Sequence, residues 1–295
     1  MIRRPPRSTL DRSSAASDVY KRQYSFSETI DIEVGLRVES RDADYVDNNG
    51  PAPDGFFCIA IYPKPESCLF NNEYNNSEDF WGGKIVIKNQ INDNLFSYFL
   101  ISQGYKPGGI NIEGNVTNEN LEYDSETMIN YELGIKGNLN KNFLFQTSIF
   151  YQDREDVQTK QSIVTSINSG EQGGLCPCSF TDYIGNAVKG SNYGLEMELI
   201  WLINNELDLF FNLGLLETEF NNYLSFSHVD SDLENGIPVN LNGRDQSHAP
   251  RYQLSLGMNY KITDNLFIKF DIEAKDEFYF SDRHNVQSDD YVLFN

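Results

Sequence analysis

The sequence contains no apolar run of the roughly eighteen residues that a membrane-crossing helix needs. It is also poor in positive charge, with 23 Lys and Arg against 44 Asp and Glu and a net charge of −21. Binding to phosphates requires basic surface, so we exclude nucleic acid as a partner. A membrane is not excluded, because a membrane-spanning strand needs only about ten residues of alternating polarity.

Cysteine is scarce, with four residues in 295. Cys58 and Cys68 lie in one Pro-containing stretch, which they could close as a disulfide in an oxidising compartment. Four cysteines can also bind zinc, but the Cys176-Pro177-Cys178 spacing lacks the usual two intervening residues. No catalytic constellation stands out either. We therefore expect no metal site, no cofactor and no enzyme activity.

What is plentiful is Tyr, Phe, Asn and Gly, which suit strands and turns. The segment Tyr131–Tyr151 predicts a hairpin, because side chains alternate between faces with a period of two. Its polar, Asn-rich turn is Asn138–Asn142. One face is apolar (Phe143, Phe145, Ile149), and the other is polar (Glu132, Lys136, Gln146).

The same alternation of apolar and polar residues recurs along the chain, which predicts nine strands and the start of a tenth. Short Asn- and Asp-rich turns alternate strictly with long polar connections. The long connections are predicted at residues 40–80, 104–125, 154–192, 218–251 and 275–290. This rhythm is typical of a transmembrane β-barrel of outer-membrane type, whereas loops of such length are uncommon in a compact soluble domain.

The two faces favour the same fold. Aromatic residues stand near several strand ends, as expected for girdles at the two membrane interfaces: Trp81, Tyr131, Tyr151, Trp201, Tyr252 and Tyr260. The charged face suits a wet lumen, since an unpaired charge in a dry core costs several kcal/mol. The alternative is a soluble β-sandwich, because alternation alone does not separate the two folds.

The N-terminal residues differ in composition from the rest of the chain. Residues 1–23 carry six Lys or Arg against two Asp, without the apolar stretch of a signal peptide. Part of this stretch resembles a translated sequencing adapter, and a natural basic tail is the alternative. We expect residues 1–23 to be a disordered, non-native tail. Residues 24–295 should form an all-β partial barrel, an open curved antiparallel sheet of about ten strands.

Five short motifs occur in an order that resembles the β-barrel domain of TonB-dependent outer-membrane receptors. The segment G-Y-K-P-G-G-I-N is similar to that family's G-Y-K-P-G-G-F-N. The five stretches that carry the resemblance are Val34–Glu39, Gly104–Asn111, Glu126–Gly137, Gly194–Glu198 and Ala249–Gly257.

The resemblance implies a transporter whose barrel of about twenty-two strands is closed by an N-terminal plug. It implies uptake of a ferric siderophore, haem, cobalamin or an oligosaccharide in the bacterial outer membrane, energised through TonB. The expected partners are the TonB complex, outer-membrane lipid and a small nutrient such as an iron chelate. The plug, the TonB box and the closing strands of that pattern do not appear in this sequence.

Ligand candidates are assigned from position only. We name Tyr105 and Lys106 at a strand rim, and Arg244 and His248 in a long loop; His228 and His284 are also predicted in loops, where polar residues without function are common. Two alternative functions remain: an outer-membrane barrel for passive diffusion or adhesion, and a soluble β-sheet binding module.

Overall fold

The computed structural model describes residues 12–47, 72–111, 116, 118–169, 175–232 and 237–295. Eleven strands form one antiparallel sheet. In spatial order they are β1 (Arg12–Ser25), β2 (Ile30–Asp47), β3 (Asn72–Asn92), β4 (Leu95–Lys106), β7 (Glu126–Asn140), β8 (Phe143–Ser169), β9 (Leu175–Leu202), β10 (Leu207–Asn221), β13 (Tyr252–Thr263), β14 (Leu266–Lys275) and β15 (Tyr291–Phe294).

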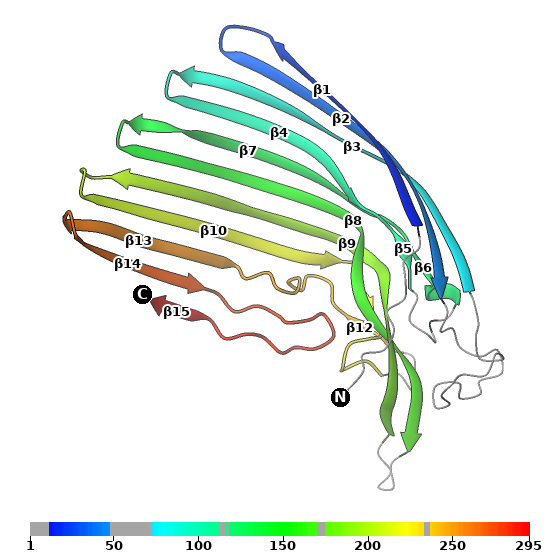
Figure 1. The fold of residues 1–295 in the computed structure, drawn as a ribbon. Helices are drawn as coiled ribbons and strands as arrows, with labels where there is room; N and C mark the ends of the chain where they lie inside the picture. Colours follow the sequence, from blue (N-terminus) through cyan, green and yellow to red (C-terminus); the bar gives the residue numbers. More distant parts are fainter. Residues whose placement is uncertain (1–11, 48–71, 112–115, 117, 170–174, 233–236) are drawn as a thin grey trace.

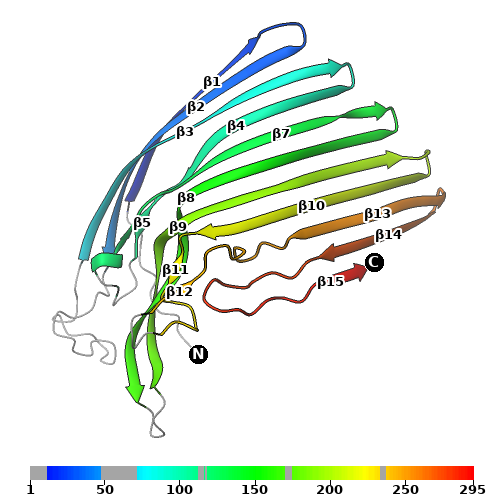
Figure 2. The same cartoon turned by 180° about the vertical axis from the view of Figure 1, so that it is seen from behind.

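The sheet is strongly curved and open, like part of a barrel wall (Figures 1 and 2). Each strand of the sheet pairs with the next one in sequence, apart from the short strands within the long connections. Those short strands form two small sheets, β5 (Gly109–Ile110) with β6 (Glu122–Tyr123), and β11 (Leu224–Ser225) with β12 (Val239–Asn240). The prediction of a partial, open β-barrel wall is confirmed.

Short turns lie at one end of the sheet and long connections at the other. In the hairpin of β7 and β8, Tyr131 pairs with Tyr151 and Leu133 with Ile149, and only two residues separate the strands. Asn142 closes this turn by donating its backbone N–H to the side chain of Asn140. Side chains of Asn and Asp bond locally to the backbone in this way, which is why they mark the short turns.

Two predicted loops are shorter than expected, because the strands continue beyond the girdle residues. The sequence predicts a loop over 154–192, but β8 runs to Ser169 and β9 begins at Leu175, paired over most of that length. Likewise, β2 and β3 pair as far as Asp47 and Asn72. The sequence of these extensions is polar and rich in Ser and Gln and shows no regular apolar alternation, so the pattern carries no strand signal there.

Only residues 12–23 of the predicted disordered tail are among the described residues, and residues 1–11 lie outside them. Residues 12–23 belong to β1, which pairs with β2 from Arg12–Asp44 to Ser25–Asp31. An antiparallel ladder is made by backbone groups, so the unusual composition of this segment does not prevent pairing. Cys58 and Cys68 lie outside the described residues.

Among the described residues, two small clusters of buried apolar side chains lie at the long-connection end. One contains Ala43, Tyr45 and Ile110, and the other contains Phe220, Tyr223 and Leu241. Among the described helical residues, only the short 3-10 turn Asn118–Asn120 occurs, and no helix there is long and apolar enough to cross a membrane. The sheet therefore exposes both faces instead of covering a core.

Candidate functional site: the polar inner face and its loop-side rim

The outer face of the sheet is an apolar band. Large aliphatic side chains at alternate positions are about half exposed, including Val34, Leu36, Val38, Ile85, Ile87, Leu133, Ile149, Leu215 and Leu256. A contiguous apolar surface that spans most strands is far larger than a water-soluble monomer leaves open. This face fits hydrocarbon, as the predicted assignment of Ile149 requires.

Aromatic residues border this band at both ends. Tyr151 is adjacent to Tyr131 and Tyr193 in the ladder, and Phe143 is adjacent to Trp201. The two rows are eight residues apart along β8, or about 27 Å at roughly 3.4 Å per residue. After strand tilt, that separation agrees with an apolar belt of about 25 Å between aromatic girdles.

The inner face, opposite the apolar band, is charged and hydrogen-bonded. The carboxylate of Glu33 is nearly buried among three lysines, with Nζ–O distances of 3.2 Å to Lys21, 2.7 Å to Lys84 and 3.2 Å to Lys88. On another part of this face, the Tyr98 hydroxyl donates to Glu132 at 2.5 Å. A carboxylate with several partners is the arrangement that a wet or ligand-filled lumen permits.

The faces of β4 are reversed relative to the sequence pattern. Phe96, Tyr98 and Leu100 look like an apolar outer set, but Tyr98 bonds to Glu132 on the inner face, and Phe99 is exposed on the outer side. The reason is an aromatic–glycine pairing. Tyr98 lies directly opposite Gly134, and a Cβ at Gly134 would lie less than 3.0 Å from the Tyr98 ring.

The same pairing occurs twice more on the inner face. Phe150 lies opposite Gly194, and Phe210 lies opposite Gly257. At both glycines an added Cβ would come within 3.0 Å of the facing ring. An aromatic ring that covers a cross-strand glycine is a known way to stabilise a curved sheet. The glycines in the polar face therefore make room for inward aromatic rings.

The K-P-G-G segment lies at the loop-side rim, which we define as the long connections together with the strand ends that carry them. Gly108 is held from both sides: its backbone N–H donates to Glu78 at 3.1 Å, and its carbonyl accepts from Arg41 at 2.9 Å. A Cβ there would collide with the carbonyl of Tyr123. The segment is thus clamped onto the wall, and Gly108 is required for close approach.

Tyr105 and Lys106 precede this clamp. The Tyr105 ring stacks on Phe80 at a centroid distance of 4.6 Å, and its hydroxyl donates to Glu39 at 2.8 Å. Burial and the hydrogen bond to that carboxylate raise the pKa of Tyr105. Lys106 is exposed, and its ammonium group has no hydrogen bond or ion pair within the part of the chain that the structure describes.

Lys106 borders a cavity of about 470 Å³, which we call the rim pocket. Its wall is formed by the end of β4, the small β5–β6 sheet and the extended β8–β9 hairpin. The lining residues are Lys106, Ile110, Asn111, Tyr123, Gln158, Thr159, Lys160, Asp182, Tyr183 and Ile184.

Arg244 and His248 do not face this pocket. Arg244 donates to the backbone carbonyls of Ser281, Asp282 and His284 at 2.6–3.1 Å. Its guanidinium also lies 4.1 Å from the ring centroid of Tyr279. An arginine with these contacts fastens one loop to another. The structure therefore brings Tyr105 and Lys106 together and separates them from Arg244.

His248 has a positive φ of 60° and packs against two aromatic rings, Phe278 at 5.5 Å and Phe280 at 6.5 Å. Its backbone N–H donates to the carbonyl of Tyr279. His228, also predicted in a loop, is buried and contacts Asn285. Both histidines therefore join the loop 222–251 to the loop 276–290.

Side chains that the sequence did not single out also take part in the contact between these two loops, which we call the loop joint. The Tyr223 hydroxyl donates to Asp282 at 2.6 Å in a buried position, and burial with that carboxylate raises the pKa of Tyr223. Arg283 contacts Asp182 at 3.0 Å, and Lys160 contacts the same carboxylate at 2.7 Å. Hydrogen bonds from Lys160 and Ser162 lower the pKa of Asp182 to about 2. No local pattern marks these residues, because their partners are far away in sequence.

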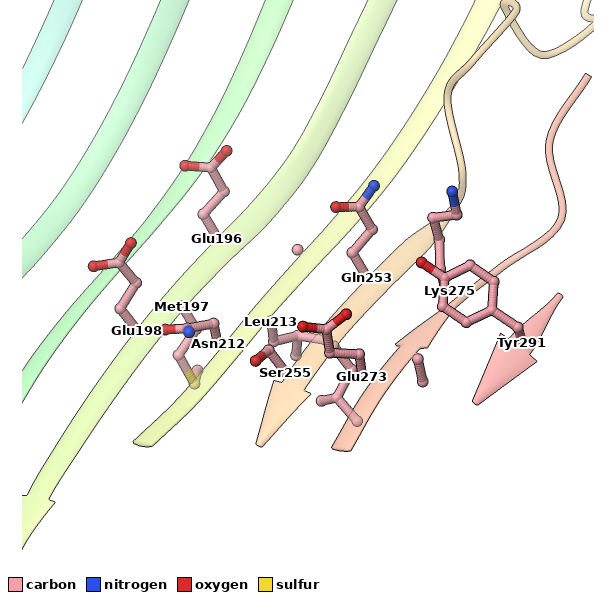
Figure 3. A pocket seen from close by; sticks show the side chains of 13 residues that line it. Glu196, Met197, Glu198, Asn212, Leu213, Gln253, Ser255, Glu273, Lys275 and Tyr291 are labelled. Carbon is pink, nitrogen blue, oxygen red and sulfur yellow. The ribbon is translucent and has the colours of Figure 1, made fainter. Parts of the chain in front are cut away.

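A second hollow lies on the inner face over β9, β10, β13 and β14 (Figure 3). It has a volume of about 500 Å³, and its lining includes Glu196, Glu198, Glu273, Lys275 and Tyr291. The carboxylates are spread along the wall, and the described residues contain no group of three His, Cys, Asp or Glu placed to hold a metal ion. This part of the lumen is acidic, in contrast to the lysines around Glu33.

An apolar outer band between aromatic girdles, a charged inner face, short turns at one end and folded long connections at the other define a wall segment of an outer-membrane β-barrel. A family model described as "TonB dependent receptor-like, beta-barrel" matches residues 5–295, and the chain belongs to this family. The predicted resemblance and the location in the bacterial outer membrane are confirmed.

Similar proteins agree with this assignment. The chain is 26% identical over 190 residues to the pesticin receptor of Yersinia enterocolitica, which covers 64% of this chain and 24% of that receptor. It therefore spans about a quarter of the length of this curated relative. The curated pesticin receptor of Yersinia pestis is 25% identical over the same length.

Solved structures share the fold at lower identity. The ferric yersiniabactin uptake receptor FyuA from Yersinia pestis gives a TM-score of 0.66 at 20% identity, covering 96% of this chain and 37% of that one. The siderophore receptor PiuA from Acinetobacter baumannii gives 0.67 at 15% identity, covering 96% and 36%. The copper transporter OprC gives 0.64 at 9% identity, covering 96% and 40%. The fold is therefore shared by siderophore-related receptors and a copper transporter.

Proposed function

We propose that the intact protein is an outer-membrane receptor that takes up a scarce nutrient, with an iron chelate of the siderophore class as its cargo, energised through TonB. Family membership over residues 5–295 carries this proposal. The names of the similar proteins support the cargo class, because they include a ferric yersiniabactin receptor and a siderophore receptor. We propose transport by binding and conformational change, without catalysis.

The charged inner face supports a lumen that holds water, protein or ligand. Glu33 is paired with three lysines there, and those lysines are themselves partly exposed. We propose that the partners are the TonB complex, which acts through a region preceding the barrel, and outer-membrane lipid, which covers the apolar band. The short turns would then face the periplasm and the rim the exterior.

We propose Lys106 as a direct ligand contact, because its ammonium group is exposed beside the rim pocket. Tyr105, Arg244 and His248 are also proposed to serve ligand binding, by holding the rim in shape. Residues 24–295 are proposed to be one segment of a single barrel domain. The family match extends this segment back to residue 5.

The test is uptake of ferric chelates by cells that express the intact receptor, in strains with and without a working TonB. We expect saturable accumulation of iron that disappears when TonB is inactivated. Accumulation that rises linearly with concentration and is independent of TonB would instead show a passive barrel. Adhesion without any uptake would also contradict the proposal.

A further inference from the structure

The rim pocket carries an excess of positive charge in a strongly acidic chain. Its lining contains two lysines, Lys106 and Lys160, but one carboxylate, Asp182, which also pairs with Arg283, while the net charge of the chain is −21. Lys160 uses one oxygen of Asp182, at 2.7 Å, and Arg283 uses the other, at 3.0 Å. Since Lys106 has no ionic partner among the described residues, the pocket retains unneutralised cations.

The walls of the pocket are fixed in place before any ligand arrives. Asn111 pairs with Ile184 as a strand would, donating from Nδ2 to its carbonyl and accepting its N–H, both at 2.8 Å. The Gln158 amide donates to the carbonyls of Pro107 at 2.8 Å and Asp124 at 3.0 Å. These bonds tie the β4–β7 connection to the β8–β9 hairpin. A preformed pocket loses little entropy when it binds a ligand.

The lining also indicates what kind of chemical group would carry the anion. Ile110 and Ile184 provide apolar surface, and Tyr123 and Tyr183 provide aromatic rings. The Tyr183 hydroxyl is held by the Gln161 side chain at 2.7 Å, which fixes that ring. Aromatic and apolar walls with a few cations at the mouth suit a flat ring that carries an oxyanion.

We propose that the rim pocket is a subsite for an oxyanion, a carboxylate or phenolate, borne on an aromatic ring of the transported chelate, with Lys106 and Lys160 as its charge contacts. The proposal rests on the proposed uptake function, because it assigns the substrate chemistry of that receptor. Asp182 acts as a positioning residue, since it pairs with Lys160 and is itself held by Arg283.

The experiment uses the intact receptor in detergent and a matched pair of probes, benzoate and the neutral benzamide, with binding followed by ligand-observed NMR. We expect benzoate to bind and to compete with the transported chelate, and benzamide to bind more weakly. The double variant Lys106→Gln and Lys160→Gln should weaken benzoate binding roughly threefold to tenfold, as expected for two partly exposed ion pairs. Binding should also weaken as salt is added.

The control is Lys261→Gln, which removes the same charge from a lysine at the short-turn end that pairs with Asp264 at 2.7 Å. This variant should bind benzoate like the parent. Replacing Lys106 and Lys160 with arginine should restore binding. Equal binding of benzoate and benzamide, or unchanged benzoate binding by the double variant, would each overturn the subsite.

Failure of the subsite and failure of the uptake function give different results. TonB-dependent iron uptake without benzoate binding refutes the subsite and leaves the receptor function intact. Benzoate binding that depends on Lys106 and Lys160, without any TonB-dependent uptake, refutes the function and leaves an anion pocket in a barrel of another role.

Discussion

The membrane-crossing sheet and the loop-side rim are held together by different kinds of contact. In the sheet, neighbouring strands pair residue by residue, and the polarity of each side chain follows from its face. In the rim, single side chains reach across the chain: Arg283 contacts Ser162 and Asp182, which are 121 and 101 positions away. The sheet therefore depends on a repeated local pattern, and the rim on a few specific residues.

If this comparison is right, a charge on the outer face should do the most damage. Ile135 pairs with Thr147, midway between the two aromatic rows, and points outward. The change Ile135→Lys should destabilise the intact protein by about 2–4 kcal/mol, because an ammonium group near the midplane loses its hydration. Phe145→Lys, nearer the short turn, should cost less. The measurement is the free energy of unfolding in lipid vesicles.

The matched control is Gln146→Lys, on the inner face of the same hairpin, where a charge remains hydrated. This variant should insert like the parent. If Ile135→Lys and Gln146→Lys had the same effect, the assignment of the two faces would be wrong.

The aromatic–glycine pairs give the next largest effect, and they test the inner face of the sheet. A methyl group at Gly134 would overlap the Tyr98 ring, so Gly134→Ala should cost about 1–3 kcal/mol through overpacking. Gly214 is also in the sheet, but a Cβ there would meet nothing within 4 Å. Gly214→Ala should be neutral, or stabilising by roughly 0.4–1 kcal/mol through reduced chain entropy.

Combining Gly134→Ala with Tyr98→Ala distinguishes ring overlap from backbone effects. Removal of the ring should recover most of the stability that Gly134→Ala loses, in a double-mutant cycle of unfolding free energies. No recovery would mean that the glycine is required for backbone geometry alone.

A substitution in the rim should change hydrogen exchange only in the segments that the substituted residue contacts. Arg244→Gln removes the cation that three backbone carbonyls of the loop 276–290 share. We expect faster hydrogen exchange in this loop and around Phe220, with no change in the hairpin Tyr131–Tyr151, because that part of the sheet has no contact with the loop. Arg251→Gln is the control, since this arginine is exposed and pairs only at the surface with Asp245 and Glu217. Equal exchange in both variants would show that Arg244 does not stabilise the loop joint.

This contrast explains how much can be predicted from the sequence. The alternation at Tyr131–Tyr151 is enough to predict the hairpin, its turn and its two faces, because successive side chains of a strand point to opposite faces. In β4 the same kind of alternation is misleading. It groups Tyr98 with the apolar face, but the Tyr98 ring turns inward and covers Gly134 on the next strand. The polar extensions of β8 and β9 carry no alternation, so their sequence cannot be told from that of a loop.

The candidate site was predictable only in part. The K-P-G-G segment placed Lys106 at the rim, since glycine and proline mark a tight turn. Its neighbours in the pocket, Lys160 and Asp182, became visible only through the register of β8 and β9. Arg244 and His248 were named because they lie in a long loop, but their partners lie in a later loop. Contacts of that kind depend on the folded chain and leave no mark in local sequence.

The smallest expected effect is the pH dependence of the rim. The pKa of Asp182 is lowered from 3.8 to about 2 by Lys160, Ser162 and Arg283. A carboxyl group with a depressed pKa in the folded state contributes its full stability above about pH 4 and loses it as the pH falls through 2. The rate of proteolysis of the β8–β9 extension should therefore be constant from pH 7 to about pH 4 and should rise only below pH 4.

In Asp182→Asn, cleavage should be faster at neutral pH and should lack this acid step, whereas Asp264→Asn at a short turn should behave as the parent does. An unchanged acid step in Asp182→Asn would show that another carboxylate holds the rim together, and Lys160 would then lack the anchor that places it at the pocket mouth.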